Sequence, residues 1–334
     1  MSDPALPMTD TAGMLAVLRG EGPVIITTHT TPDADALGSQ LGLLRFLRAQ
    51  GREVRAINAD AVPEALRFLD GGNDLERWDA AVHEHVVLDA ALIVCVDLNE
   101  RGRCGALASA LERSGATIAV IDHHLDPKPF AHHYLSVIEA SSTAEIVLDL
   151  ITAAGMPLDF ALAQPLYAGI VTDTGSFRFE RTTPALHRKA ALLLEAGVDP
   201  QDTHRRIYDD YPVGRTMLLG RVLADMRQVC DGRVTILRVT RQMFEDTGTS
   251  LEDVENIVNY GLGIRGVEAT ALLTEVEDTV KISFRSRGAI AVNTIAQQFN
   301  GGGHRLAAGG RVYGQPLESV TQRVVKALCK AVGA

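Results

Sequence analysis

The chain has 334 residues, of which 46% are hydrophobic and 22% charged, and its formal net charge at pH 7 is −10. This length exceeds one typical domain, so we expect two domains with substantial apolar cores. The acidic balance excludes a broad basic face for coating long nucleic acid, because phosphate contacts supply most non-specific affinity. A small phosphorylated ligand stays compatible, since metal ions held by carboxylates make a site locally positive.

No apolar run in the sequence reaches the roughly 20 residues that a membrane-spanning helix needs. The first residues also lack the basic and apolar regions of a secretory signal. We therefore expect a cytoplasmic protein without membrane association. Its four cysteines form no CxxC pair, and we expect all of them to be reduced thiols. They are Cys95, Cys104, Cys230 and Cys329.

Short β-branched runs alternate with longer segments of helical period between residues 24 and 138. This alternation predicts an α/β fold with a doubly wound parallel sheet. In such sheets ligands bind beyond the carboxyl ends of the strands. The expected strands are 24–28, 54–58, 92–97, 117–122 and 136–138, with helices such as 38–49 between them.

Further helical patterns cover residues 146–153, 160–171, 185–196 and 201–208. The segment Ser142-Thr-Ala-Glu145 has the spacing of a capping box, so we interpret it as a helix start. A polar stretch, 208–212, ends in proline and is the best candidate for a linker. The domain boundaries that we expect are 1–207 and 215–334, with the linker at about 208–214.

The second domain is predicted to be a smaller α/β domain. A short turn at residues 277–279 indicates a hairpin of its two central strands, and a glycine-rich loop at 301–304 precedes its last strand. The expected helices are 216–227, 251–260, 292–299 and 317–332. The expected strands are 233–239, 268–275, 280–285 and 310–313.

Imidazole and carboxylate side chains follow apolar segments at four places in the first domain. Such oxygen-rich ligand sets, with few imidazoles, favour hard divalent cations that act on phosphates. Each cluster alone could be a solvated loop, but so many carboxylates at one sheet edge are costly unless they are paired or bound to metal. The clusters are His29 with Asp33 and Asp35, Asp97, Asp122 with His123 and His124, and Asp173.

Five motifs occur in a characteristic order: HTTPDADALGS (29–39), VDLNERGRCG (96–105), IDHH (121–124), GIVTDTGSFRF (169–179) and GGGHRLAAG (301–309). With these motifs the chain resembles DHH-family phosphoesterases of the DHH plus DHHA1 architecture. That group contains oligoribonucleases, 3′-phosphoadenosine-5′-phosphate phosphatases and RecJ-type exonucleases. The resemblance implies an active site in a cleft between the two domains.

The resemblance also implies two divalent cations, with Mn²⁺ expected and Mg²⁺ or Co²⁺ as alternatives. The implied ligand sets overlap: His29, Asp33 and Asp97 for one cation, and Asp35, Asp97, His123 and Asp173 for the other. Asp97 would bridge the cations and is a catalytic candidate. Asp122 is expected to orient a neighbouring imidazole or the loop. This leaves His124 to contact the scissile phosphate or the leaving oxygen, with a structural role as the alternative.

Substrate contacts are expected from both domains. Arg101 and Arg103 follow Asp97 closely, and one of them could bind a phosphate oxygen with its guanidinium group or form a salt bridge that shields the acidic cluster. Arg103 is the candidate that we choose. In the second domain, glycines can approach a ligand closely and offer backbone N–H groups to an anion. The candidates there are Gly302, Gly303, His304, Ser283, Arg285 and Ser286.

The function implied is hydrolysis of short oligoribonucleotides, including linear dinucleotides such as pApA and pGpG, to mononucleotides. Removal of the 3′-phosphate from 3′-phosphoadenosine 5′-phosphate is implied as well, by attack of a metal-activated hydroxide. Hydrolysis of cyclic dinucleotides such as cyclic di-AMP is the alternative. A catalytically inactive nucleotide receptor is disfavoured, because the ligand set is complete. Family resemblance also suggests a homodimer.

Overall fold

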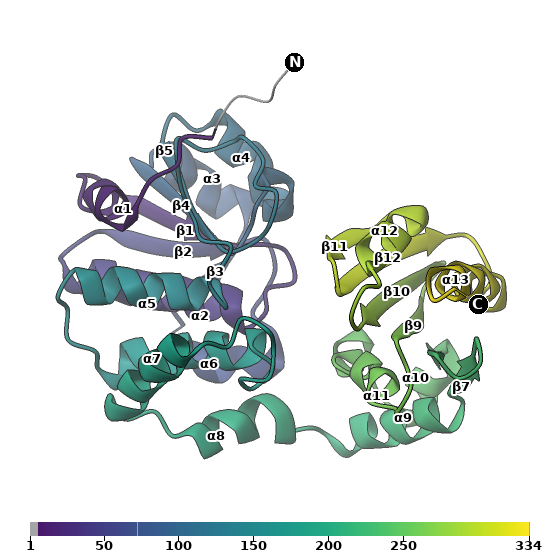
Figure 1. Ribbon diagram of the computed structural model, residues 1–334. Coiled ribbons are helices and arrows are strands. Elements are labelled where there is room, and N and C mark those ends of the chain that lie inside the picture. Colours follow the sequence, from purple (N-terminus) through teal and green to yellow (C-terminus); the bar gives the residue numbers. More distant parts are fainter. Residues whose placement is uncertain (1–5, 72, 334) are drawn as a thin grey trace. The chain divides into compact units, whose positions relative to one another are not determined.

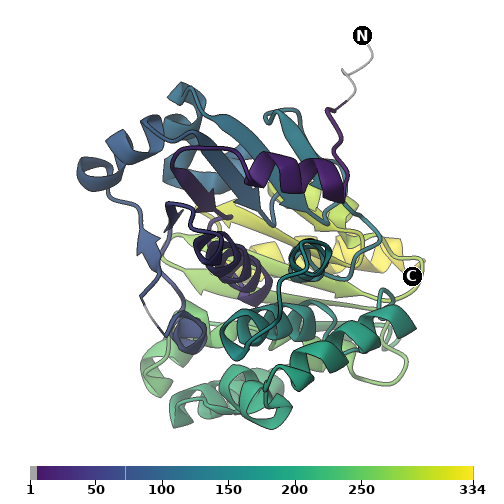
Figure 2. The ribbon, with the colours of Figure 1, turned by 90° about the vertical axis from the view of Figure 1, so that its left-hand side faces the viewer.

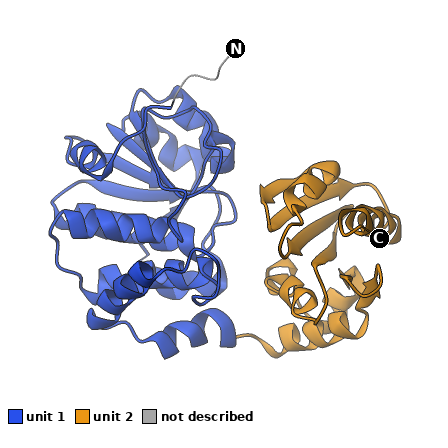
Figure 3. Cartoon of the chain, viewed as in Figure 1, with its two compact units in different colours: residues 1–210 blue, residues 211–334 orange. Residues whose placement is uncertain are grey.

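The computed structural model describes residues 6–71 and 73–333. The chain forms two compact units, residues 1–210 and 211–334, each with its own sheet and apolar core (Figure 3). We refer to them as unit 1 and unit 2.

Unit 1 contains a six-stranded parallel sheet with the order β3-β2-β1-β4-β5-β6 (Figure 1). The order reverses direction between β1 and β4, which makes their carboxyl ends the topological switch point of a doubly wound sheet. The predicted parallel sheet is thus confirmed. The strands are β1 Val24–Thr27, β2 Val54–Asn58, β3 Leu75–Arg77, β4 Leu92–Val96, β5 Thr117–Asp122 and β6 His133–Ser136.

Two differences from the expected strands have local causes. The strand expected at 136–138 lies earlier, as β6, where Tyr134 and Leu135 are buried. The edge strand β3 was not predicted, because two of its three residues are only partly buried, the third is exposed, and they form no apolar run. The sequence therefore predicted the buried strands but not the edge strand β3.

Alternate side chains of the strands supply two apolar cores. Val24 and Ile26 of β1 pack in the core that includes α2, α5 and α6, whereas Ile25 packs in the core with α3 and α4. Figure 2 shows α2 and α5 nearly end-on, on the same side of the sheet. The helices are α1 Thr11–Leu18, α2 Ala34–Ala49, α3 Ala80–Leu88, α4 Ala108–Arg113, α5 Thr143–Ala153, α6 Phe160–Asp173, α7 Pro184–Glu195 and α8 Pro200–His204.

Helices α2 and α6 approach closely at glycines. A Cβ atom on Gly38 would overlap the carbonyl oxygen of Pro165, and a Cβ atom on Gly169 would lie 2.9 Å from Oδ1 of Asp35. Both positions therefore exclude a side chain unless the helices move apart. This contact holds Asp35, near the start of α2, against α6, which ends at Asp173.

Unit 2 contains a second six-stranded sheet with the order β11-β12-β10-β9-β8-β7, in which only β8 and β9 pair in parallel among the described strands. The hairpin of β9 and β10 is confirmed, with Thr279 opposite Val276. The strands are β7 Arg227–Val229, β8 Val234–Val239, β9 Ala269–Val276, β10 Thr279–Ser286, β11 Gly302–His304 and β12 Ala307–Tyr313. The helices are α9 Val213–Ala224, α10 Arg241–Thr247, α11 Val258–Leu262, α12 Val292–Ala296 and α13 Leu317–Ala331.

Several predicted elements of unit 2 were wrong in detail. The helix expected at 251–260 is interrupted by Asn256, whose φ is 65°, and becomes a short 3-10 turn followed by α11. The segment expected as a glycine-rich loop forms the edge strand β11, because it pairs with β12. The last predicted helix is confirmed as α13.

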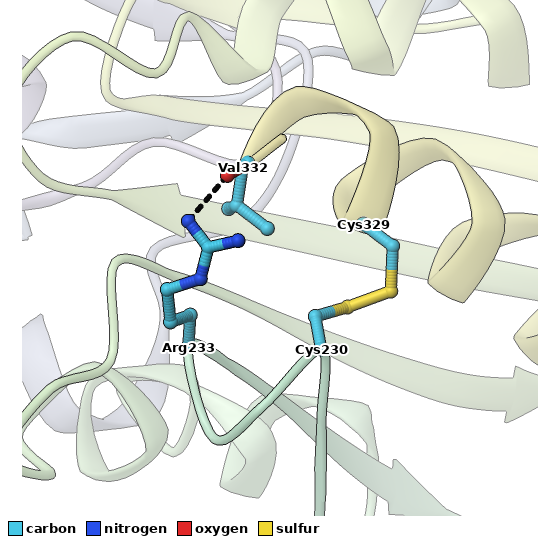
Figure 4. Close-up of a disulfide and its surroundings, with 4 residues drawn as sticks. All are labelled: Cys230, Arg233, Cys329 and Val332. Carbon is cyan, nitrogen blue, oxygen red and sulfur yellow. Dashed lines mark hydrogen bonds between the residues drawn. A yellow bond between two sulfur atoms is a disulfide. The ribbon is translucent and has the colours of Figure 1, made fainter. Parts of the chain in front are cut away.

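The expectation of four reduced cysteines was wrong for two of them. Cys230, in the turn before β8, and Cys329, in α13, form a disulfide with a Cα–Cα distance of 5.5 Å (Figure 4). Nearby, the Arg233 guanidinium donates a hydrogen bond to the Val332 carbonyl. Cys95 and Cys104 are free and buried, as expected. The pairing joins residues 99 positions apart, so no local spacing could indicate it.

Among the described residues, no helix has both the length and the apolar character that crossing a membrane requires.

Candidate metal centre

The loop after β1 carries the first group of candidate ligands. The ring Nδ1 of His29 lies 2.8 Å from the carbonyl oxygen of Thr30, which can only accept, so Nδ1 bears the proton. Its other ring nitrogen, Nε2, faces Oδ2 of Asp97 at 3.4 Å. Asp33 is the N-cap of α2, and its Oδ1 accepts from the backbone N–H groups of Asp35 and Ala36 at 3.0 Å each. The start of α2 thus determines the loop geometry.

Asp35 is almost completely buried in the first turn of α2. Its carboxylate accepts hydrogen bonds from the backbone N–H groups of Thr143 at 2.7 Å and Ala144 at 2.9 Å. These groups belong to the first turn of α5, where unpaired N–H groups and the helix dipole favour a negative charge. The helix start expected at Ser142 is confirmed, since its hydroxyl accepts from the Glu145 N–H. The same helix start also positions Asp35.

Asp97 follows β4 at the switch point of the sheet. Its φ of 60° is in the left-handed region, and its backbone N–H donates to the Ile121 carbonyl at 3.0 Å. A non-glycine residue held there costs free energy and often marks a functional site. The Asp97 carboxylate is buried, and its Oδ1 accepts from the Thr143 hydroxyl at 2.9 Å. Thr143 was not predicted as a site residue, because the sequence pattern indicated only that it begins a helix.

His123 joins three of these carboxylates. Its Nε2 lies 3.3 Å from Asp173 Oδ2, 3.7 Å from Asp97 Oδ1 and 4.0 Å from Asp35 Oδ2. Its Nδ1 lies 3.3 Å from a guanidinium nitrogen of Arg181, which also donates to the Ala140 carbonyl. Arg181 was not predicted, and its surroundings in the sequence carry no motif that singles it out.

The six predicted metal ligands are therefore brought together in the structure. Two groups of ligand atoms could each hold a metal ion. A third group shares Asp97 with the first and His123 with the second. The groups are His29 with Asp33 and Asp97, Asp35 with His123 and Asp173, and Asp97 with His123 and His124.

His124 is oriented by Asp122. The imidazole Nδ1 lies 2.7 Å from Asp122 Oδ1, so it donates to the carboxylate. Its Nε2 then faces the guanidinium group of Arg103, at 3.4 Å. Burial lowers the pKa of His124, but the hydrogen bond to Asp122 and the charge of Asp97 outweigh burial and raise it. The structure thus brings Arg103 and His124 together beside the carboxylate cluster.

Burial and the repulsion between neighbouring carboxylates raise the pKa values of two members of the cluster. Burial, together with the charges of Asp97, Asp173 and Asp33, raises the pKa of Asp35 well above its usual range. Burial and the charges of Asp97 and Asp33 raise the pKa of Asp173 to about 8. Burial acts in the same direction on Asp97, but a hydrogen bond from His29 and the charges of the imidazoles outweigh it and lower its pKa. A divalent cation would relieve this repulsion, so the donor set fits such an ion.

The substrate residues predicted in unit 2 divide into two groups. Ser283 and Arg285 alternate along β10 with the buried residues Ile282 and Phe284 and share the opposite sheet face. The structure does not bring Ser286 together with them, because its hydroxyl is buried and donates to the Ile290 carbonyl. Burial lowers the pKa of Arg285, which donates to the carbonyl of Phe284.

The three glycines before His304 differ in whether the surrounding structure leaves room for a side chain. A Cβ atom on Gly303 would lie 2.8 Å from the Ala307 carbonyl oxygen, and one on Gly301 would overlap the backbone of β12. These two glycines therefore permit close strand pairing. A Cβ atom on Gly302 would have no heavy atom of the described structure within 4 Å, so of the three only this glycine leaves open space.

Comparison with known proteins agrees with this architecture. The DHH family, N-terminal domain, matches residues 23–170, and the DHHA1 domain matches residues 231–334. A bifunctional oligoribonuclease and PAP phosphatase NrnA from Thermus thermophilus is 36% identical over 308 residues, which cover 92% of this chain and 90% of that protein. The protein of the same description from Bacillus subtilis is 29% identical over 311 residues, covering 92% and 95%. An exopolyphosphatase-related protein from Bacteroides fragilis has a crystal structure with a TM-score of 0.91, 30% identity and 97% coverage of both chains.

The fold and the site define a two-domain α/β protein whose parallel sheet presents a candidate metal centre at its carboxyl edge. The chain belongs to the DHH family of phosphoesterases, in the branch that joins a DHH domain to a DHHA1 domain. The family resemblance of the five motifs is thereby confirmed.

Proposed function

We propose that this protein hydrolyses short oligoribonucleotides, including linear dinucleotides, to mononucleotides and removes the 3′-phosphate of 3′-phosphoadenosine 5′-phosphate. The observation that carries the proposal is the convergence of four carboxylates and three imidazoles at the switch point of the unit 1 sheet. The names of the relatives that align along almost the whole chain support the choice of substrates.

We place two divalent cations, Mn²⁺ in the first instance, at this site. His29, Asp33 and Asp97 would hold one of them, and Asp35, Asp97, His123 and Asp173 the other. When bound, such cations act as Lewis acids that neutralise phosphate charge and lower the pKa of water. Thr143 and the first turn of α5 hold Asp97 and Asp35 in place by hydrogen bonds.

His124 and Arg103 are the groups that we assign to the phosphate. Asp122 fixes the His124 ring with Nδ1 protonated and stabilises its charged form. His124 Nε2 can then donate to a phosphate oxygen or deliver a proton to the leaving oxygen. Arg103 can contribute a guanidinium contact to the same phosphate.

Unit 2 would bind the remainder of the nucleotide. Ser283 and Arg285 on β10, with Gly302, Gly303 and His304 of β11, are the proposed contacts. We further propose that the protein is cytoplasmic and that it forms a homodimer. The cytoplasmic location and the homodimer are proposed from family resemblance and sequence composition alone.

The test is product release from a panel of substrates with Mn²⁺ and with chelator. The panel contains 3′-phosphoadenosine 5′-phosphate, linear pApA, a five-nucleotide RNA and cyclic di-AMP. Metal-dependent turnover of the short linear substrates supports the proposal, whereas preference for cyclic di-AMP supports the alternative activity. Failure to turn over any member would contradict the proposal.

Asp97→Asn is the matched inactive variant for this assay. It should reduce turnover by at least about a thousandfold, because the shared ligand is lost, and it should leave the fold intact. Asp74→Asn, which changes a carboxylate that pairs with Arg45 and Arg48 elsewhere in unit 1, is the control. Unchanged turnover by the Asp97 variant would refute the bridging assignment.

A further inference from the structure

Unit 2 contains a basic pocket that includes Ser283 but extends beyond the contacts proposed above. The cavity has a volume of about 210 Å³ and is lined by Lys281 and Ser283 of β10, Gly309 and Arg311 of β12, and Asn300. Lys281 and Ser283 flank the buried Ile282 on β10, and Gly309 and Arg311 flank the buried Gly310 on β12, so these four residues share one face of the sheet. We call this cavity the β10–β12 pocket.

Two positive charges face each other across the floor of the pocket. Lys281 and Arg311 are direct partners in the antiparallel pairing of β10 with β12. Like charges in this arrangement destabilise a sheet. Burial lowers the pKa of Lys281, and the charge of Arg311 lowers it further, while the attraction of Glu255 is the smallest of these effects.

Glu255 attracts Lys281, but no carboxylate of the described residues forms a salt bridge with either cation. In the part of the chain that the structure describes, neither cationic side chain has a hydrogen bond or a salt bridge, and the Ser283 hydroxyl has no hydrogen-bond partner. Three arginines of unit 2, by contrast, pair with carboxylates: Arg221 with Asp246, Arg233 with Glu268 and Arg238 with Asp225. Two cations and a hydroxyl that share one cavity form a binding site for an anion with several oxygen atoms.

The β10–β12 pocket has free space at Gly309 and lies beside the glycine-rich segment, residues 301–304. A Cβ atom on Gly309 would meet nothing closer than the Ile282 carbonyl oxygen at 3.5 Å, so the glycine leaves its floor free. The Asn300 amide donates to the Arg311 carbonyl at 3.2 Å and ties the start of this segment to β12. A ligand held near Gly302 and His304 could therefore extend into the pocket.

We propose that the β10–β12 pocket binds the non-scissile phosphate monoester of a short nucleotide substrate. This inference rests on the proposed function, since pApA and 3′-phosphoadenosine 5′-phosphate both carry a terminal 5′-phosphate besides the scissile group. The candidate metal ligands all belong to unit 1, whereas the pocket belongs to unit 2. A second phosphate of the same ligand is therefore the group that we assign to it.

The test compares binding of pApA and of ApA, which lacks the 5′-phosphate, by titration calorimetry with chelator present. The full-length wild type should bind pApA about 10- to 100-fold more tightly than ApA, because charge-assisted contacts have that strength. Lys281→Met and Arg311→Met should each remove most of this difference and leave the Kd for ApA unchanged. Lys326→Met removes an exposed charge from α13 and should preserve the difference.

Thermal unfolding separates a ligand site from a structural pair. Removing either charge relieves repulsion, so Tm without ligand should stay equal or rise, whereas a structural role would lower it. Inorganic phosphate should raise the wild-type Tm more than that of the double variant. Equal affinity of the wild type for pApA and ApA, or equal weakening of both by the variants, would overturn the inference.

The enzymatic function and the phosphate assignment of the β10–β12 pocket are tested by different measurements, so either can be contradicted without the other. Absence of hydrolysis with Mn²⁺ would contradict the enzymatic function, but the chelator titration involves no turnover and still decides whether the pocket binds the 5′-phosphate. Conversely, normal hydrolysis without any preference for the 5′-phosphate would remove the pocket assignment alone.

Discussion

At the scale of single residues, Thr143 links two candidate metal ligands that come from different strands and helices. Its backbone N–H binds the Asp35 carboxylate, and its hydroxyl binds the Asp97 carboxylate. Groups that orient ligands in this way commonly affect metal affinity almost as strongly as the ligands do. Thr143 therefore belongs to the candidate centre although it offers no ligand in the metal sets described above.

We expect Thr143→Val to weaken Mn²⁺ binding or turnover by about 10- to 100-fold, because Asp97 loses its hydroxyl donor. The backbone contact to Asp35 and the buried volume are retained. Mn²⁺ titration and steady-state kinetics measure the effect.

Ser142→Ala is the control for Thr143→Val. It removes the helix cap and should lower the free energy of unfolding by about 0.5–2 kcal/mol, with a smaller effect on Mn²⁺ affinity. If the Thr143 variant binds Mn²⁺ as the wild type does, the positioning role is wrong.

At the scale of elements, the α2–α6 contact sets the distance between Asp35 and Asp173. The contact depends on glycine at position 38, where any Cβ atom meets the backbone of α6. Gly38→Ala should lower the free energy of unfolding by about 1–3 kcal/mol through overpacking, and should reduce Mn²⁺ affinity because the helices separate. Chemical denaturation and metal titration check both effects.

Gly220→Ala is the matched helical control. Position 220 lies in α9, and a Cβ atom there has no heavy atom of the described structure within 4 Å. This variant should stabilise the protein by about 0.5–1 kcal/mol, since alanine loses less conformational entropy in a helix. Destabilisation by both variants alike would show that crowding at Gly38 is not the cause.

The disulfide between Cys230 and Cys329 connects the β7–β8 turn to α13. Closing a loop of about 100 residues contributes up to about 4.7 kcal/mol in the chain-entropy description. Cys329→Ser should therefore lower Tm under oxidising conditions, and reductant should bring the wild type to the level of the variant. Thiol titration before and after reduction, followed by thermal unfolding, measures this; a wild-type Tm that stays constant when two further thiols appear would contradict it.

At the scale of the whole molecule, stability, pH and metal binding are linked through the carboxylate cluster. Asp35 and Asp173 have raised pKa values in the folded protein, so they contribute stability at low pH that is lost as pH rises toward about 8 for Asp173. His29 and His124, whose pKa values are raised, act in the same direction, whereas the lowered pKa of His123 acts against them.

We expect the metal-free protein to have a lower Tm at pH 8.5 than at pH 6. Mn²⁺ should reverse this order, because binding displaces protons from Asp35 and Asp173 and so strengthens as pH rises. At a free Mn²⁺ concentration 1,000 times Kd, the stabilisation is about 4.1 kcal/mol. Scanning calorimetry at both pH values with Mn²⁺ or chelator checks the prediction.

Asp173→Asn provides the control for the pH dependence. It removes one proton that Mn²⁺ must displace, so the stabilisation by Mn²⁺ should be smaller and should depend less on pH. A Tm of the metal-free wild type that does not fall between pH 6 and pH 8.5 would contradict the linkage.

The sequence by itself determined the class of fold and the candidate metal ligands. Buried strands such as β1 and β4 were predicted from their apolar runs, and His29 and Asp97 come within two residues of the ends of these strands. Parallel strands bring their carboxyl ends to one edge, so adjacency along the chain was enough to predict adjacency in space.

Only the tertiary structure decided the features that depend on register and on long-range packing. Cys230 meets Cys329 because α13 packs on the second sheet, and Thr143 meets Asp97 because α5 begins beside β4. The pairing of Lys281 with Arg311 depends on one strand register, in which a shift by one residue would turn one of the charges into the core. Local pattern carries no information about such contacts, because each joins segments that become neighbours only when the chain folds.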